Sequence, residues 1–450
     1  MMSLWFEQAL LPQGWASHVR VTIDGEAVTQ VESDQPVQPH DERHAIGLPG
    51  LANLHSHAFQ YAMAGLAETA GADERDNFWS WRSLMYALVA RLTPEDMLAV
   101  AAMSQVEMLE AGFTRVGEFH YLHHQPDGTA YDEPAAMASA VASAAQETGI
   151  ALTLLPVFYA HSDFGGKPPQ PEQRRFLNDV DGFSRLVESA RTAAHRLPDA
   201  VVGVAPHSLR AVTPDALTAL LGIAPDSPIH IHVAEQEREV AACLAWSGQR
   251  PVAWLLDHMP VDGRWCLVHA THVEGGELAG MARQGAVVGL CPITEANLGD
   301  GIFPAADWIA AGGGFGIGSD SNVRIDAAEE LRLLEYGQRL QLQRRNLLGA
   351  AGQSTGGSLF DRAMTGGAQA LGIPRPVIAP GAPADIIALS ADHEGIRGDQ
   401  PLDRWIFTRG REAVDAVWRR GRRLVAQGRH VARDAIAARY AGTVRRLRSG

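Results

Sequence analysis

Eight short apolar runs recur along the middle of the chain, at residues 46–54, 113–119, 150–158, 200–206, 228–233, 264–269, 286–290 and 314–319. Short continuous apolar runs are typical of buried strands, and most of these runs are separated by longer stretches with apolar residues at helical spacing. Eight strands that alternate with helices predict a closed parallel barrel in preference to an open sheet.

The clearest helix is expected over residues 93–112, which open with Thr-Pro-Glu-Asp. Thr93 can cap this helix, Pro94 suits its first position, and Asp96 stands where a capping carboxylate belongs. Residues 133–148 and 213–221 are similar, and the second of these segments opens with Thr-Pro-Asp. Residues 162–173 are rich in Gly and Pro and predict a mobile surface loop.

The two ends of the chain have a different pattern. Residues 19–23 form a strand-like run that is followed by Asp24-Gly25, a hairpin signal. Residues 384–388 and 414–425 are again strand-like, with Gly421 at an expected turn. We therefore expect an α/β fold in which residues 46–377 form a (β/α)8 TIM barrel. Residues 1–45 and 378–450 are expected to form a small β-sandwich domain beside it.

The composition narrows the class of protein. The chain has 450 residues, of which 46% are hydrophobic and 20% charged, as in an ordinary soluble globular protein. Its formal net charge of −14 argues against a nucleic acid as partner, because phosphate binding needs a basic surface. The Arg-rich stretch 411–448 is expected to be a solvated helix and strand face. No apolar run has the length of a membrane span, so no membrane partner is expected.

The first residues and the cysteines bear on the compartment. Residues 1–11 lack the basic, apolar and cleavage regions of a secretory signal. Cys243, Cys266 and Cys291 cannot build a disulfide framework, so we expect reduced, mostly buried thiols. A cytoplasmic protein is therefore expected.

Polar side chains follow the apolar runs at the carboxyl ends of the expected strands, where barrels carry their active sites. His55 and His57 end the first run and point the same way, because side chains alternate along a strand. The other residues in such positions are Tyr121, His207, His232, His269 and Asp320. A lone histidine at a strand end is more often a hydrogen-bonded structural residue. Several at matching strand ends instead predict a site for a divalent metal ion.

Lysine chemistry has only one candidate. Lys167 is the single lysine of the chain and lies in the loop-like segment Gly-Gly-Lys-Pro-Pro. A Schiff base, or a carbamylated lysine that bridges two metals, is therefore not expected.

This constellation resembles the amidohydrolase superfamily, in which a His-x-His after the first strand, a His after the fifth and an Asp after the eighth hold the metal. Within the superfamily, the chain is similar to the N-formimino-L-glutamate deiminases of histidine degradation, over nearly its whole length. Among the stretches that carry this resemblance are Asn-Leu-His-Ser-His-Ala-Phe-Gln-Tyr at 53–61, Ala-Pro-His-Ser-Leu-Arg at 205–210 and His-Ile-His-Val-Ala-Glu-Gln at 230–236. Two further stretches are 118–124 and 294–300.

The resemblance implies one Zn²⁺ ion per subunit, because residues 205–207 read Ala-Pro-His where binuclear members carry a bridging lysine or another acid. The implied ligands are His55, His57, His232 and Asp320. The ion would lower the pKa of a bound water to about 7, so that hydroxide attacks the substrate.

The catalytic residues are expected to be Glu235, His269 and Asp320. Glu235 would exchange protons with the attacked imine nitrogen and with the departing ammonia. His269 is expected to stabilise the site or act as base toward the water, which Asp320 can also orient. The sequence leaves open which of these two takes the proton.

The implied substrate is a small molecule with a formimino group and two carboxylates, which require cationic or donor partners. By the resemblance, the glutamate portion is bound by Arg82, Tyr121, His207 and Arg210, and Gln60 faces the substrate near the metal. The implied products are N-formyl-L-glutamate and ammonia, and we expect a homodimer. His120, His123 and His124 are expected to be loop histidines, since four ligands are already assigned.

Other interpretations stay open. Arg82 is equally well a surface residue stacked on tryptophan, Glu235 a carboxylate at a helix N-terminus, and Asp320 a turn residue. His269 is alternatively a structural histidine. The whole chain is alternatively another deaminase of the superfamily that acts on a nucleobase-like ring, or a non-catalytic barrel scaffold. A ring substrate has no use for two arginines.

Overall fold

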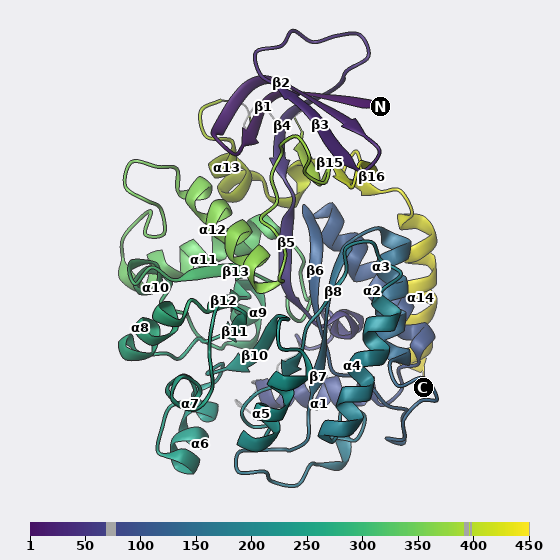
Figure 1. The fold of residues 1–450 in the computed structure, drawn as a ribbon, viewed down its shortest axis with the longest axis vertical. Coiled ribbons are helices and arrows are strands. Elements are labelled where there is room, and N and C mark those ends of the chain that lie inside the picture. The colour runs from purple at the N-terminus through teal and green to yellow at the C-terminus, as the bar shows by residue number, and fades with distance from the viewer. Residues whose placement is uncertain (69–77, 391–395, 397, 450) are drawn as a thin grey trace.

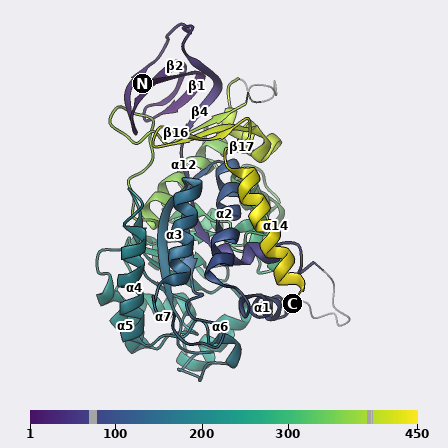
Figure 2. The same ribbon diagram turned by 90° about the vertical axis from the view of Figure 1, so that its right-hand side faces the viewer.

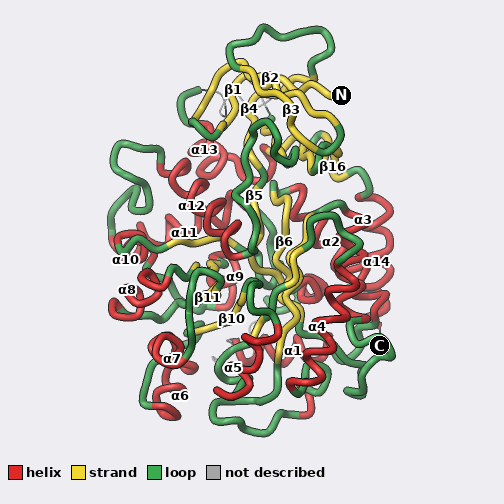
Figure 3. The backbone as a smooth tube through the Cα atoms, in the orientation of Figure 1, coloured by secondary structure: helices red, strands yellow, loops and turns green. Residues whose placement is uncertain are grey.

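Strands gather in the centre and at one end of the molecule, and helices surround the central strands (Figure 1, Figure 3). The computed structural model describes residues 1–68, 78–390, 396 and 398–449. The strands are β1 (Met2–Leu11), β2 (Gly14–Asp24), β3 (Ala27–Glu32), β4 (Glu42–Pro49), β5 (Leu51–Ser56), β6 (Phe113–His120), β7 (Ala151–Phe158), β8 (Val201–Val202), β9 (Ala205–Pro206), β10 (Ile229–Val233), β11 (Trp265–His269), β12 (Val287–Leu290), β13 (Gly314–Ile317), β14 (Ile386–Leu389), β15 (Val414–Arg419), β16 (Arg422–Ala426) and β17 (Arg429–His430). The helices are α1 (Phe78–Val89), α2 (Pro94–Glu110), α3 (Ala136–Thr148), α4 (Val180–Ala194), α5 (Pro214–Ile223), α6 (Glu237–Ser247), α7 (Pro251–His258), α8 (Gly275–Gln284), α9 (Pro292–Leu298), α10 (Ala305–Ala310), α11 (Ala327–Leu342), α12 (Thr355–Ala370), α13 (Pro401–Arg404) and α14 (Arg433–Ser449).

The eight central apolar runs of the sequence all contain strands, and these strands form a (β/α)8 barrel. Strands β5 to β8 pair in parallel in chain order, and so do β10 to β13. The barrel closes through a bridge between Val204 and Ile229 on one side and a bridge between Ser56 and Asp320 on the other. The predicted fold class is therefore confirmed, with the fourth run divided into β8 and β9.

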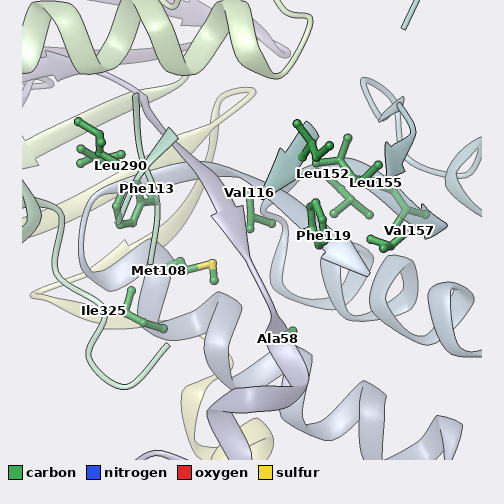
Figure 4. Packing of buried hydrophobic residues seen from close by; sticks show 14 of the residues in the cluster. Ala58, Met108, Phe113, Val116, Phe119, Leu152, Leu155, Val157, Leu290 and Ile325 are labelled. Carbon is green, nitrogen blue, oxygen red and sulfur yellow. The ribbon is translucent and has the colours of Figure 1, made fainter. Parts of the chain in front are cut away.

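One large cluster of buried apolar side chains includes residues of the barrel strands and of the helices around them. Val116, Phe119, Leu152, Leu155 and Val157 project from β6 and β7 and are almost completely buried (Figure 4). Each large apolar side chain buried in this way contributes about 1.5–3 kcal/mol to folding. These contacts hold β6 and β7, and hence the residues at their carboxyl ends, in fixed positions.

The N-terminus of α2 has the capping arrangement that its sequence predicts. The Thr93 hydroxyl oxygen accepts a hydrogen bond from the backbone N–H of Asp96, and the Asp96 carboxylate accepts one from the backbone N–H of Thr93. Pro94 stands at the first helical position. This capping box satisfies backbone donors that the helix itself cannot satisfy, so α2 begins where predicted.

Strands from both ends of the chain form one sheet in the order β17-β16-β15-β14-β4-β1-β2-β3. Its hairpins turn at Gly25 and Gly421, whose φ values of +59° and +72° favour glycine. The sheet has an apolar cluster of its own, to which both ends contribute, for example Phe6 from β1 and Trp418 from β15. Strand β4 pairs in this sheet and continues through Gly50 into β5, so the small domain and the first barrel strand are directly connected.

The prediction of a solvated Arg-rich face at 411–448 is wrong for several of its arginines. Helix α14 packs along α2 (Figure 2), and Arg433 there pairs with Glu107 and Glu110 of α2. Arg411 pairs with the same two glutamates. Glu110 is only 4% exposed, so these arginines neutralise carboxylates that face the interior. In the described part of the chain, no helix combines the length and apolarity needed to cross a bilayer.

Candidate functional site

Three barrel strands bring His55, His57, His232 and Asp320 together at their carboxyl ends, as the sequence predicts. The Nε2 atom of His55 lies 3.2 Å from Nε2 of His57 and 3.0 Å from Nε2 of His232. The Oδ1 atom of Asp320 lies 3.2 Å from Nε2 of His57. All four side chains are buried, so four ligand-type atoms face one small volume that is shielded from solvent.

The four residues fit a divalent cation. Nε2 of His55 faces two other ring nitrogens, although one ring nitrogen makes only one in-plane hydrogen bond. A tetrahedral Zn²⁺ with nitrogen ligands at about 2.0–2.1 Å places neighbouring ligand atoms roughly 3.3 Å apart. The separations between these side chains are close to that value, and imidazole with carboxylate is a donor set that zinc accepts.

The protonation states also suit a metal. Burial lowers the pKa of His55 to about 3 and the pKa of His232 well below its usual range. Burial works in the opposite direction on Asp320, but hydrogen bonds with His55 and His57 hold the pKa of its carboxyl well below the usual range. At neutral pH these imidazoles therefore keep a free lone pair and the carboxylate keeps its charge, as metal ligation requires.

Unusual backbone conformations fix the ends of the strands. His269 has φ +66° and Asp320 has φ +45°, in the left-handed region that costs about 1–3 kcal/mol for residues other than glycine. The backbone N–H of Asp320 donates to the carbonyl of His55 at 3.0 Å, and the N–H of His57 donates to the carbonyl of Asp320 at 2.9 Å. The amide of Asn322 also donates to the His57 carbonyl. These bonds tie the end of β13 to the end of β5, so they position ligands from both strands.

Glu235 and His269 lie beside Asp320. Nε2 of His269 is 3.7 Å from Oδ2 of Asp320 and 3.9 Å from Oε1 of Glu235. The carboxylate that caps the backbone before α6 is Glu239, which accepts from the N–H groups of Ala234 and Glu235 at 3.0 and 3.3 Å. Glu239, and not Glu235, therefore accepts these backbone N–H groups.

The pKa values of this pair are displaced from those in water. Burial raises the pKa of Glu235. Burial alone would lower the pKa of His269, but the carboxylates of Glu235, Glu295 and Asp320 outweigh it and raise that pKa to about 10. Both side chains therefore hold a proton at neutral pH more readily than they would in water.

One chamber is lined by three of the four candidate metal ligands, His57, His232 and Asp320, and also by Glu235 and His269. The same chamber is lined by all five side chains expected to bind substrate, which are Gln60, Arg82, Tyr121, His207 and Arg210. Gln60 lies on the 3₁₀ turn η1 (Ala58–Met63) that follows β5, and its amide donates to the hydroxyl of Tyr121 at 2.9 Å. Arg82 donates to the hydroxyl of Tyr159 at 3.1 Å, and its guanidinium carbon lies 5.2 Å from the centre of the Tyr86 ring. Arg82 is half-buried and lines the chamber.

Three residues of the site were not predicted. Tyr159 follows the third apolar run directly, so its position at a strand end was available in the sequence. Tyr86 lies in α1 and meets the chamber only through the fold. Glu295, in the first turn of α9, holds His269, with Oε1 3.2 Å from Nδ1 of the ring.

Cys291 lies near His269 and Asp320, and these three residues form a second group of close ligand-type atoms. Burial raises the pKa of the Cys291 thiol well above its usual range, so the sulfur keeps its proton and is a poor metal ligand. All three cysteines are buried and free, as predicted.

The histidines expected in a loop after the second strand are more buried than that prediction implies. His120 is the last residue of β6 and is fully buried, which contradicts its assignment to the loop. His123 and His124 follow the strand, and their rings pair with the carbonyls of Val157 and Leu177. These three residues pack β6 against its neighbours and lie apart from the ligand cluster.

Comparison with known proteins is consistent with this geometry. The profile of the "Amidohydrolase family" matches residues 46–424, and that of "Formimidoylglutamate deiminase HutF, N-terminal domain" matches residues 1–45. The chain belongs to the amidohydrolase family. A formimidoylglutamate deiminase of Pseudomonas aeruginosa is 48% identical, with 98% of each chain covered.

Solved amidohydrolases have the same fold. An amidohydrolase from Brucella melitensis superposes with a TM-score of 0.96 at 52% identity, covering 99% of this chain and 100% of that one. An adenosine deaminase from Xanthomonas campestris with bound zinc superposes with a TM-score of 0.83 at 21% identity, covering 100% and 99%. Amidohydrolases depend on a metal, and in this chain His55, His57, His232 and Asp320 form the candidate metal site.

The bridging lysine of binuclear amidohydrolases has no counterpart at this site. The fourth strand position ends at His207, whose ring packs edge-on against His232 at 5.0 Å. Lys167 lies in the loop after β7, where its ammonium pairs with Asp163 at 2.6 Å. The Nζ atom of Lys167 therefore has a carboxylate partner outside the ligand cluster.

Proposed function

We propose that this protein hydrolyses N-formimino-L-glutamate to N-formyl-L-glutamate and ammonia in histidine degradation. The observation that carries the proposal is that Arg82 and Arg210 line the same chamber as the candidate ligands His57, His232 and Asp320 and as Glu235 and His269. A substrate with two carboxylates and a hydrolysable amidine carbon matches this arrangement. Identity of 48% to a formimidoylglutamate deiminase over 98% of the chain supports the same substrate.

The proposed cofactor is one Zn²⁺ per subunit at His55, His57, His232 and Asp320, where it would polarise a water and lower its pKa to about 7. Asp320 faces this position as a charged carboxylate and is proposed to receive the proton of that water. His269, which holds its own proton at neutral pH, is proposed to stabilise the negative charge that develops on the attacking oxygen. Oxygen adds to the formimino carbon, the carbon–nitrogen bond to the terminal nitrogen breaks, and that nitrogen leaves as ammonia. The carbon keeps the oxygen as the formyl carbonyl.

Glu235 is proposed to move protons to the leaving nitrogen. Burial raises the pKa of Glu235, so its carboxyl group holds a proton more readily than it would in water, as a general acid needs. Arg82 and Arg210 are proposed to pair with the two carboxylates of the substrate, and Tyr121, His207 and Gln60 to position its backbone and formimino group. Burial lowers the pKa of His207 well below its usual range, so this ring acts as a neutral hydrogen-bonding group.

The test measures ammonia release from N-formimino-L-glutamate, cytosine, guanine and adenosine by the metal-loaded protein. We expect turnover of formiminoglutamate alone, and a loss of at least about 100-fold in kcat/KM for Arg210→Ala with the metal retained. Unchanged turnover in Arg210→Ala would remove Arg210 from the pocket. Faster ammonia release from cytosine, guanine or adenosine than from formiminoglutamate would favour the alternative of a deaminase for nucleobase-like rings. A metal content near zero after purification without chelators would favour the non-catalytic scaffold.

The remaining expectations belong to the same proposal. We propose that residues 1–45 and 378–450 form the small domain and residues 46–377 the catalytic barrel, and the sheet that joins strands from both ends of the chain supports a shared small domain. Residues 46–49 of β4 also pair in that sheet, with β1 and β14. The protein is proposed to be cytoplasmic, which its buried free cysteines support, and to be a homodimer.

A further inference from the structure

The chamber with the ligand cluster adjoins a second, wider chamber on its outer side. Arg82, Tyr86 and Arg210 line both. The outer chamber has a volume of about 370 Å³, whereas the inner one has about 50 Å³. The remaining walls of the outer chamber come from α6 and from the loop that joins β7 to α4. A small molecule that reaches the ligand cluster from this side passes these walls first.

Positive charge predominates in the outer chamber. Its cationic side chains are those of Arg82, Lys167, Arg210 and Arg238. Among the described residues, two carboxylates line it, that of Glu239 and that of Asp163, which pairs with the Lys167 ammonium at 2.6 Å. The Glu239 carboxylate accepts the backbone N–H groups of Ala234 and Glu235, which precede α6, and these bonds offset part of its charge. On a chain whose net charge is −14, this local excess of cations is opposite in sign to the rest of the molecule.

The loop that carries Lys167 is held in place by specific contacts. The backbone N–H of Ser162 donates to the carbonyl of Lys167 at 3.1 Å, and its hydroxyl donates to the carbonyl of Pro168 at 2.7 Å. The ring of Phe164 stacks on Trp246 of α6, with centroids 5.5 Å apart. The loop is therefore anchored to α6.

A second set of bonds ties the loop to α1. The amide of Gln173 donates to the hydroxyl of Tyr159 at 2.7 Å, and this hydroxyl also accepts from Arg82 at 3.1 Å. The single lysine of the chain is thus positioned on a wall whose other sides are Arg82 and Arg238.

We propose that the outer chamber is an electropositive entrance that concentrates small dicarboxylates before they reach the metal-ligand cluster. Lys167 and Arg238 attract the carboxylates, and Arg82 and Arg210, which line both chambers, receive them. Charge of one sign at the mouth of a cleft raises the local concentration of oppositely charged solutes, and salt weakens this effect. This proposal deepens the proposed function and rests on it for the identity of the substrate. The positive charge of the outer chamber by itself selects only the chemical class, small dicarboxylates. A neutral ring gains nothing from it.

The experiment compares kcat and kcat/KM for N-formimino-L-glutamate in Lys167→Gln, Arg238→Gln and the double variant, at about 20 mM and about 300 mM NaCl. At low salt we expect kcat/KM to fall about threefold in each single variant and about tenfold in the double variant, with kcat within about twofold of wild type. At high salt the difference from wild type shrinks. Asp163→Asn, which removes a negative charge from the same wall, is expected to raise kcat/KM at low salt. Arg344→Gln, at an exposed position after α11, is the matched control and leaves both constants unchanged.

A binding measurement separates this proposal from the proposed function. Glutarate, a dicarboxylate without a formimino group, is titrated calorimetrically into the metal-loaded protein, with neutral glutaramide for comparison. Glutarate binding that is weaker and less dependent on salt in the double variant than in the wild type would support the proposed electropositive entrance. This result would hold even if formiminoglutamate is not hydrolysed. Wild-type kcat/KM and glutarate affinity in the double variant at low salt would overturn it, and so would a loss of kcat with kcat/KM independent of salt.

Discussion

The Nδ1 atom of His269 lies 3.2 Å from Oε1 of Glu295, and both side chains are buried. The same carboxylate oxygen accepts the backbone N–H of Cys291 at 2.9 Å, so it is fixed at the start of α9. With Nδ1 engaged by Glu295, the ring presents Nε2 toward Asp320 and Glu235. Glu295 thereby determines both the orientation of His269 and which ring nitrogen faces the chamber.

Replacing Glu295 tests this relationship. Glu295→Ala should lower kcat about 10- to 100-fold, because His269 loses the group that orients it. Metal content and glutarate affinity should stay at wild-type values, because Glu295 is outside the ligand set. Glu295→Gln should recover part of the activity, since its amide oxygen can still accept from Nδ1. Wild-type kcat in Glu295→Ala would show that the pair has no role in turnover.

The ligand set is tested by two substitutions on one strand. His232→Asn should reduce bound zinc, measured by elemental analysis after purification without chelators, and should abolish ammonia release. His230→Asn is the matched control, because His230 is also buried in β10 but its ring pairs with the carbonyl of Ala370 at 2.8 Å. The control should keep its metal. Equal metal content in the two variants would contradict the proposed ligands.

The positions of the ligand-type residues could be predicted because the relevant information is local. An apolar run followed by a polar residue marks a strand end, and a barrel brings all such ends together. His55, His232 and Asp320 are placed by this rule alone. Glu295 could not be placed in this way, because a carboxylate in the first turn of a helix ordinarily serves that helix. Its contact with His269 joins two different βα units and depends on how the barrel closes.

The difference between local and long-range information also explains why the predictions for Arg433 and His120 were wrong. The sequence around Arg433 resembles a solvated helix face, because the acidic partners Glu107 and Glu110 lie more than 300 positions away. His120 was assigned to a loop, although it is the last residue of β6, all of whose residues are buried. The local sequence pattern predicts neither the pairing of Arg433 with distant glutamates nor the residue at which β6 ends.

Buried neutral histidine should make the metal-free protein sensitive to acid. Burial lowers the pKa of His120 to about 4, below the usual value of about 6.5. Between these pH values the unfolded chain binds the extra proton and the folded chain does not, so the stability contributed above pH 6.5 is lost as pH falls toward 4. His120→Leu should therefore reduce the drop in the free energy of unfolding between pH 7 and pH 4.5 by about 2 kcal/mol.

Urea unfolding of the metal-free protein at the two pH values measures this change. His195→Gln, at an exposed position that follows α4, is the control and should keep the wild-type pH dependence. If His120→Leu loses as much stability on acidification as wild type does, His120 does not cause the acid sensitivity.

The ion-pair network between α14 and α2 should matter for stability. Among the described residues, Arg433→Ala leaves Arg411 as the remaining ion-pair partner of Glu107 and Glu110, and it should cost about 1–2 kcal/mol of unfolding free energy. Arg429→Ala, which removes an exposed pair with Asp434, should cost no more than about 0.5 kcal/mol. Denaturant unfolding measures both. Equal losses would show that burial of the glutamates is unimportant.

Lys167 gives the protein one side-chain amine, held on the wall of the outer chamber. Apart from the α-amino group, an amine-directed reagent therefore has a single target. A fluorescent dye coupled there would sit beside Arg82 and Arg238, where arriving carboxylates change its surroundings. The natural sequence is thus already suited to site-specific labelling for optical detection of ligands.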